Sequence, residues 1–256
     1  MTNPALFVDD GGSGDAPPLV FLHSAGGDTT LWSAQLAHVR AGGRRALAVD
    51  LRGHGRSPGP DGVDADDLGP EAMAGDVLAT LDALGIDRAV VVGHSMGGAV
   101  AVALAGRAPA RVAGLLLLDP ASDGRQVPAA AAADMLAGLR SEAYLDIIES
   151  FWAPMIADSS AAVRAQVLET MRATSPATMI GSLEAMLSFD PATPLRAYAG
   201  RGPWLSVITR FNEQPGAYHQ LVPALPVQRV DGTGHWLQLD APDRINAILD
   251  AFITAA

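Results

Sequence analysis

The sequence predicts an α/β fold in which helices flank a mostly parallel sheet. Six apolar runs of strand length recur along the 256-residue chain, and segments with helical spacing separate most of them. The runs stay apolar instead of alternating with polar residues, which is typical of parallel strands covered on both faces. Residues 121–200 lack such runs and keep only helical spacing. This interruption predicts a group of helices inserted into an α/β core.

The apolar runs and the helical segments alternate in a regular order. Strands are expected at residues 18–22, 45–50, 89–93, 112–118, 204–209 and 226–230. Crossover helices are expected at residues 30–40, 71–84, 96–107 and 243–254. Pro109 and Pro242 mark two of the boundaries. We therefore expect residues 1–120 and 201–256 to form one core, and residues 121–200 to form a helical cap, or lid, on it.

Composition excludes several classes of function. The formal net charge of −11 opposes binding to nucleic acid or to an anionic membrane surface. All 17 positive residues are arginine, so no lysine is present to form a Schiff base or to serve a phosphate-binding loop. The absence of cysteine excludes disulfides, thiolate nucleophiles and cysteine-bound metals. The first residues lack the pattern of a signal peptide, and we expect a cytoplasmic protein that uses no metal and no cofactor.

Residues 93–97 read Gly-His-Ser-Met-Gly between an expected strand and an expected helix. This context is typical of a nucleophile elbow, a sharp turn that lifts a serine above the edge of a sheet. The glycines at both ends relieve crowding in such a tight turn. A glycine-rich turn without chemistry is the alternative, but the flanking strand and helix favour Ser95 as a nucleophile.

A serine nucleophile needs a base and donors for the oxyanion. His235 lies in a glycine-bearing loop between the last expected strand and the last helix, above the same sheet edge as Ser95, and is the candidate general base. The backbone N–H of Met96, directly after the nucleophile, is one expected oxyanion donor. The second is expected from Ala25, in the small-residue turn that follows the first apolar strand.

The cap residues include several flexible or aromatic side chains. Such side chains suit an adaptable pocket, although each of them on its own is more often a packing residue. The candidate pocket residues from the cap are Trp152, Met155, Met179, Met186 and Phe189, and Ser24, in the turn after the first apolar strand, is a further candidate.

Several segments together resemble the capped serine hydrolases of the α/β-hydrolase fold. They are Gly93–Gly97, His23–Ala25 followed by Trp32, Asp50–Ser57, and Gly232–His235 leading to Asp240–Pro242. The resemblance covers nearly the whole chain and implies the α/β-hydrolase fold. In the family the segment that corresponds to His23–Ala25 usually begins His-Gly, whereas Ser24 follows His23 here.

The resemblance implies two positions for the triad acid. The earlier position, after the strand that follows the elbow helix, holds Asp119. The later one, after the strand at 204–209, falls by the usual spacing on Asn212, which cannot carry the negative charge. Asp119 is therefore favoured, and Glu213, one residue beyond the later position, stays the alternative acid.

These residues predict a serine hydrolase of the carboxylesterase or lactonase class. The expected substrate is a small, fairly apolar ester or lactone, cleaved through an acyl-enzyme on Ser95. Carbon–carbon bond hydrolysis or perhydrolysis on the same triad is a second possibility, and a non-catalytic ligand sensor on the same scaffold is a third. We expect a monomer or a homodimer with a small molecule as its partner.

Overall fold

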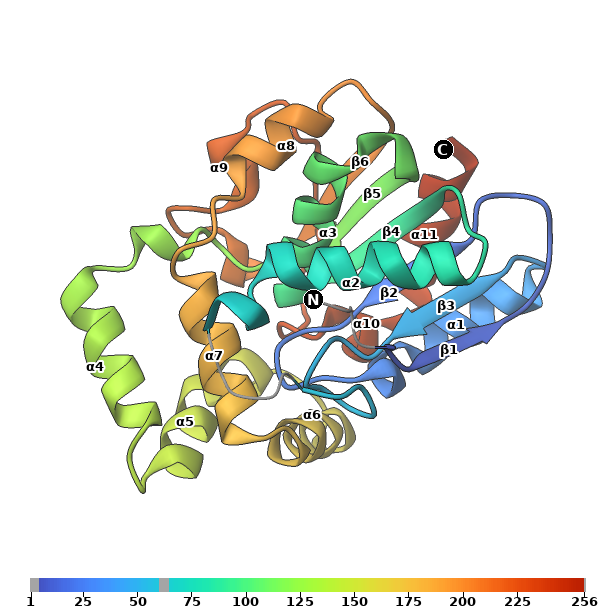
Figure 1. Ribbon diagram of the computed structural model, residues 1–256. Coiled ribbons are helices and arrows are strands. Elements are labelled where there is room, and N and C mark those ends of the chain that lie inside the picture. Colours follow the sequence, from blue (N-terminus) through green and yellow to red (C-terminus); the bar gives the residue numbers. More distant parts are fainter. Residues whose placement is uncertain (1–4, 60–64, 256) are drawn as a thin grey trace.

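One sheet organises the protein in the computed structural model, which describes residues 5–59 and 65–255 (Figure 1). Within these ranges the sheet has seven strands in the order β1-β3-β2-β4-β5-β6-β7. The strands are β1 (Val8–Gly11), β2 (Leu19–Leu22), β3 (Ala46–Val49), β4 (Ala89–His94), β5 (Val112–Leu118), β6 (Trp204–Ile208) and β7 (Val227–Arg229). All neighbouring pairs are parallel except β1 with β3. The expected α/β fold with a mostly parallel sheet is confirmed.

Helices connect the strands and continue beyond the sheet. They are α1 (Ser33–Ala41), α2 (Pro70–Ala83), α3 (Met96–Arg107), α4 (Ala129–Leu139), α5 (Tyr144–Ile156), α6 (Ala161–Ala173), α7 (Pro176–Met186), α8 (Ala192–Tyr198), α9 (Tyr218–Leu221), α10 (Leu237–Asp240) and α11 (Pro242–Ala255). The four expected crossover helices correspond to α1, α2, α3 and α11. No helix in the described ranges is long and apolar enough to cross a membrane.

The first strand, β1, was not expected from the sequence. It is an edge strand and carries the polar pair Asp9 and Asp10 instead of an apolar run. Both aspartates form ion pairs, Asp9 with Arg40 at 2.8 Å and Asp10 with Arg45 at 2.7 Å. An edge strand has one solvent-facing side and needs no continuous apolar sequence, so hydrophobic patterning does not detect it.

Alternate residues of the central strands pack into two separate hydrophobic cores. In β2, Val20 and Leu22 pack in one core with α2 and α3, while Leu19 and Phe21 pack in the other with α1 and α11. Figure 1 shows α2 and α3 on one face of the sheet and α1 and α11 on the other. Because both faces are covered, the strands read as unbroken apolar runs.

Four helices, α4 to α7, leave the core between β5 and β6 and lie to one side of the sheet (Figure 1). We call these helices and the turns that join them the insert. The next helix, α8, packs instead on α3, where Pro194 lies so close to Gly106 that any side chain at position 106 would collide with it. The expected cap, which ends at residue 200, therefore includes α8, a helix that packs on the core.

Candidate active site

Ser95 sits in the sharp turn between β4 and α3. Its backbone has φ 53° and ψ −118°, a conformation that L-residues rarely adopt and that is common at functional sites. A side chain at Gly93 would collide with the Gly97 carbonyl, and one at Gly97 would collide with the Leu22 carbonyl. The two glycines are therefore required by close packing, as a nucleophile elbow demands.

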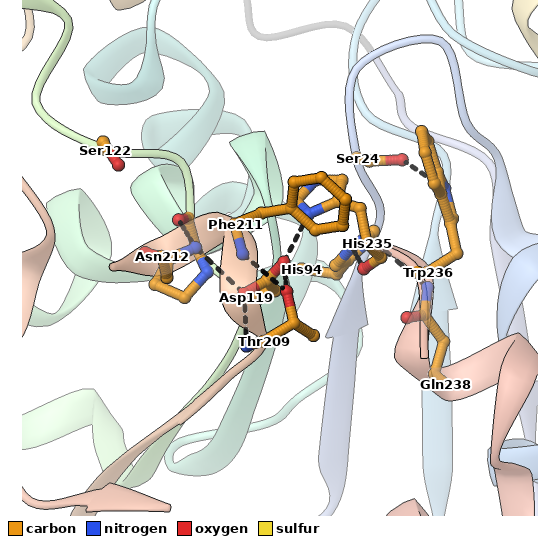
Figure 2. A network of polar contacts seen from close by, with 12 residues as sticks. Ser24, His94, Asp119, Ser122, Thr209, Phe211, Asn212, His235, Trp236 and Gln238 are labelled. Atoms are coloured by element: carbon orange, nitrogen blue, oxygen red, sulfur yellow. Dashed lines mark hydrogen bonds and ion pairs between the residues drawn. The ribbon is translucent and has the colours of Figure 1, made fainter. Parts of the chain in front are cut away.

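Asp119 follows β5 and is completely buried. Its Oδ1 accepts hydrogen bonds from Thr209 N at 2.8 Å and from Asn212 Nδ2 at 3.0 Å. Its Oδ2 accepts from Thr209 Oγ1 at 2.7 Å and lies 2.6 Å from His235 Nδ1. Figure 2 shows the carboxyl group of Asp119 between Asn212 and His235. Four contacts therefore hold this carboxyl group.

The surroundings of Asp119 keep it ionised. Burial raises the pKa of its carboxyl, but the hydrogen bonds from His235 and Thr209 and the charge interaction with His235 outweigh burial and leave the pKa below its usual value. An ionised carboxylate can only accept, so Nδ1 of His235 carries the proton of their shared hydrogen bond. The other ring nitrogen, Nε2, is then free to act as a base when the imidazole is neutral.

The structure separates the two acid candidates. Glu213 forms an ion pair with Arg229, and both side chains are nearly half exposed. Asn212, at the later position, donates a hydrogen bond to Asp119. The ends of β5 and β6 thus bring both possible acid positions to one place, and Asp119 is the carboxylate that contacts His235 there.

The backbone of His235 is fixed on both sides. Its N–H donates to the Met155 carbonyl at 2.9 Å, and its carbonyl accepts from His94 Nε2 at 2.9 Å. His94 can donate through Nε2 because its Nδ1 faces the Gln238 amide at 3.2 Å. The second elbow residue therefore holds the histidine loop, and its side chain points away from the cavity.

The expected oxyanion donors, Ala25 and Met96, follow β2 and β4, which are neighbouring strands of the sheet. Met96 is the first residue of α3, so its N–H has no acceptor within the helix. The Ser24 carbonyl accepts hydrogen bonds from His23 Nδ1 at 2.8 Å and from Gly27 N at 3.0 Å. Because a trans peptide points its C=O and N–H in opposite directions, these bonds also fix the direction of the Ala25 N–H.

A cavity of about 500 Å³ opens above the elbow, and Ser95, His235, Ala25 and Met96 all lie on its wall. Four of the six expected pocket residues, Ser24, Trp152, Met155 and Met186, also line it. The further lining residues, not expected from the sequence, are Pro120, Ala121, Ser122, Phe151, Pro154, Leu183, Arg210, Phe211, Asn212, Gln214 and Trp236. Pro120, Ala121 and Ser122 follow β5, and Arg210 and Phe211 follow β6. The carboxyl ends of the expected strands could therefore have indicated these lining residues.

Met179 and Phe189 are not on the cavity wall, which corrects the expectation for these two residues. Both are buried in the core with exposures of 0% and 4%. The end of the Met179 side chain packs against the turn at Gly26, next to Trp152. Helical spacing identifies the apolar faces of a helix, but it does not tell which face meets a cavity and which meets the core.

Sequence comparison agrees with this geometry. A family model described as "Alpha/beta hydrolase family" matches residues 19–248. The chain belongs to the alpha/beta hydrolase family.

Relatives and solved structures of this hydrolase include enzymes that act on esters. The "Dihydrolipoyllysine-residue acetyltransferase component of acetoin cleaving system" of Pseudomonas putida is 32% identical over 250 residues, which are 95% of this chain but only 65% of that protein. The "sn-1-specific diacylglycerol lipase ABHD11" of Mus musculus is 29% identical over 94% of this chain and 82% of its own length. A "thermophilic esterase from Thermogutta terrifontis" has a TM-score of 0.81 and 25% identity, and the match covers 97% of this chain and 93% of that one.

Three further histidines of the hydrolase are buried beside the site. Burial lowers the pKa of His23, brings the pKa of His54 to about 3, and holds the pKa of His94 well below its usual value. The rings of His23 and His54 are 5.2 Å apart, so a charge on one opposes a charge on the other. All three are therefore neutral in the folded protein at neutral pH.

We expect the hydrolase to lose stability on mild acidification. Below about pH 6.5 the unfolded chain protonates these histidines while the folded chain does not, so the free energy of unfolding falls as the pH is lowered. His54 and His94, whose pKa values are far below the usual value, together remove roughly 2 kcal/mol between pH 6.5 and 5.5, and His23 adds to the loss in the same direction. Urea unfolding at several pH values measures this slope, and His54→Leu removes roughly 1 kcal/mol of the loss. A free energy of unfolding that stays flat from pH 7.5 to 5.5 contradicts the prediction.

Proposed function

We propose that this protein is a serine hydrolase that cleaves a small, fairly apolar carboxylic ester or lactone through an acyl-enzyme on Ser95. The observation that carries the proposal is that His235, which contacts Asp119 at 2.6 Å, lies on the wall of the same cavity as the elbow serine. Membership of a hydrolase family supports it, as does the likeness to an esterase and to a diacylglycerol lipase.

In the first half of the proposed reaction, Ser95 Oγ attacks the carbonyl carbon of the ester. Nε2 of His235 takes the hydroxyl proton, and the Asp119 carboxylate stabilises the imidazolium that forms. The negative charge on the carbonyl oxygen is met by the N–H groups of Ala25 and Met96. The imidazolium then returns its proton to the leaving alkoxide, so an alcohol departs and the acyl group stays on Ser95.

In the second half a water molecule repeats the attack. His235 takes one proton from the water while the water oxygen bonds to the acyl carbon. The N–H groups of Ala25 and Met96 again hold the oxyanion. Ser95 regains its proton as the carboxylic acid leaves. A lactone follows the same steps, but its alcohol remains part of the product.

The cavity wall indicates the class of substrate. Apart from His235, the lining residue with an ionisable side chain is Arg210, and it forms an ion pair with Asp158 at 2.8 Å. Trp152, Met155 and Phe211 contribute apolar surface. A cavity of about 500 Å³ with such walls suits a small apolar acyl group. The insert supplies part of the wall, and we propose that it is the cap of this site.

Covalent trapping tests the proposed function. We expect a small alkyl fluorophosphonate to abolish hydrolysis of p-nitrophenyl esters, with one adduct per chain, which peptide mass mapping assigns to Ser95. The same esters give a burst of p-nitrophenol when release of the acyl group is slower than its formation. Full activity after prolonged exposure to the reagent, or an adduct at another residue, contradicts the proposal.

We expect Met186→Ala to shift the substrate preference towards longer acyl chains. Removal of this wall side chain leaves room for about two more methylene groups, and burial of each favours binding by roughly 0.8 kcal/mol. The ratio of kcat/KM for the hexanoate to that for the butyrate ester rises by about tenfold. Met135→Ala, a matched deletion in α4 away from the cavity wall, is the control. An unchanged ratio, or an equal change in both variants, contradicts the prediction.

The cytoplasmic location and the state as monomer or homodimer, both expected from the sequence, stay predictions. So does the choice of ester hydrolysis over carbon–carbon bond cleavage or perhydrolysis. A protein that binds acyl compounds without turning them over, and retains a stable partner, would instead be a ligand sensor.

A further inference from the structure

The loop that carries His235 is bound to the insert as well as to the core. The N–H of His235 donates to the carbonyl of Met155 at 2.9 Å, and Met155 lies in the last turn of α5. Carbonyl groups in the last turn of a helix have no partner within the helix. The end of α5 therefore offers an acceptor to the backbone of the base.

A second connection runs through two side chains. Oδ2 of Asp240 accepts a hydrogen bond from Gly234 N at 2.8 Å and another from Ser159 Oγ at 3.0 Å. Ser159 lies in the turn between α5 and α6 and is 4% exposed. Its own carbonyl accepts from Arg164 Nη1 at 2.5 Å, which ties this turn to α6.

Close packing at Gly234 shows how tightly the two segments fit. A Cβ atom there would lie 2.6 Å from the Met155 carbonyl oxygen and 2.7 Å from Ser159 Oγ. Real Cβ atoms do not approach other atoms so closely, so only glycine fits between the insert and the base. Gly234, the residue before His235, is therefore packed closely against the insert.

We propose that Ser159 and Asp240 are positioning residues for His235, through which the insert holds the base at its working position. This inference rests on the proposed function. Ser159 fixes Asp240 Oδ2, Asp240 fixes the Gly234 N–H, and the next residue is His235. A small shift of the loop moves the imidazole relative to both Ser95 and Asp119. The insert therefore contributes to the rate of proton transfer as well as to the shape of the cavity.

Ser159→Ala is the main test, with Ser160→Ala as its matched control. Ser160 is the adjacent serine, and its Oγ caps α6 by accepting from Val163 N at 3.2 Å, without contact to the histidine loop. For Ser159→Ala we expect kcat on p-nitrophenyl acetate to fall about tenfold or more, with KM changed less than twofold. The rate of fluorophosphonate labelling at Ser95 falls in parallel. Ser160→Ala keeps both rates within about twofold of the wild type.

Two variants of Asp240 separate hydrogen bonding from charge. Asp240→Asn keeps an oxygen that can accept from Gly234 and Ser159, so its kcat stays within about threefold of the wild type. Asp240→Ala loses both bonds, and its kcat falls at least as far as that of Ser159→Ala. Addition of Ser159→Ala to Asp240→Ala causes no further loss, because Ser159 acts through Asp240.

Three results overturn the inference. They are an unchanged kcat in folded Ser159→Ala, an equal loss in Ser159→Ala and Ser160→Ala, and an Asp240→Asn variant as slow as Asp240→Ala. The thermal unfolding midpoint of each variant shows that it is folded under the assay conditions. If the wild-type protein is not labelled at Ser95, the proposed function fails. If the wild type is labelled and Ser159→Ala behaves like it, only the positioning role fails.

Discussion

Ser95→Ala is expected to lower kcat on every ester that the wild type cleaves by about a millionfold. The substitution keeps the Cβ atom and therefore the backbone geometry of the elbow, but it removes the atom that attacks the carbonyl. Without that atom no acyl-enzyme forms, so the burst of product and the fluorophosphonate adduct disappear together. The residual rate reflects only substrate binding and the oxyanion donors. Stopped-flow release of p-nitrophenol and intact-protein mass spectrometry measure both effects.

Ser122→Ala is the matched control for this prediction. Ser122 also lines the cavity, but it lies in the loop after β5, and its Oγ contacts Gln214 at 3.4 Å. We expect its variant to retain kcat within a few fold. Retention of turnover by Ser95→Ala on any ester that the wild type cleaves would end the proposal that Ser95 is the nucleophile.

Asp119→Asn is expected to lower kcat by about ten thousandfold with little change in fold. Thr209 N and Asn212 Nδ2 both donate to the Oδ1 position, so they hold the amide oxygen of the variant there. The amide NH₂ group then faces His235 and can only donate to Nδ1. This forces the imidazole proton onto Nε2, and the base can no longer accept a proton from Ser95.

The alternative acid supplies the comparison for Asp119→Asn. Glu213→Gln removes the charge of a half-exposed side chain that pairs with Arg229, and we expect kcat to change less than about twofold. Kinetics of both variants on one ester, with circular dichroism spectra to check their folding, distinguish the two candidates. A large loss in Glu213→Gln together with a small loss in Asp119→Asn would reverse the assignment.

Local sequence predicts the elbow because its requirements are local. Positions 93 and 97 require glycine because any side chain there would collide with a carbonyl group, of the turn itself or of the end of β2. The strand and the helix on either side of the turn have clear sequence patterns. The same holds for β2 to β5, which are buried on both faces. Edge strand β1 has no such pattern, and its two aspartates find partners that the sequence does not indicate.

The proposed triad acid illustrates what local patterns leave undecided. Asp119 and Glu213 are far apart in the sequence, but β5 and β6 are neighbours, and their carboxyl ends meet at one edge of the sheet. Which carboxylate reaches His235 depends on the path of the chain after each strand. Thr209 and Asn212 turn towards Asp119, whereas Glu213 turns to Arg229.

The sequence by itself determined the alternation of the central strands with their crossover helices, the position of the elbow and the candidates for its chemistry, because these depend on residues within a few positions of one another. Only the tertiary structure decided that Asp119 faces His235, that Met179 and Phe189 pack in the core, and that the end of α5 contacts the histidine loop. These contacts join residues from distant segments, and their geometry depends on how whole elements pack, which no local pattern encodes.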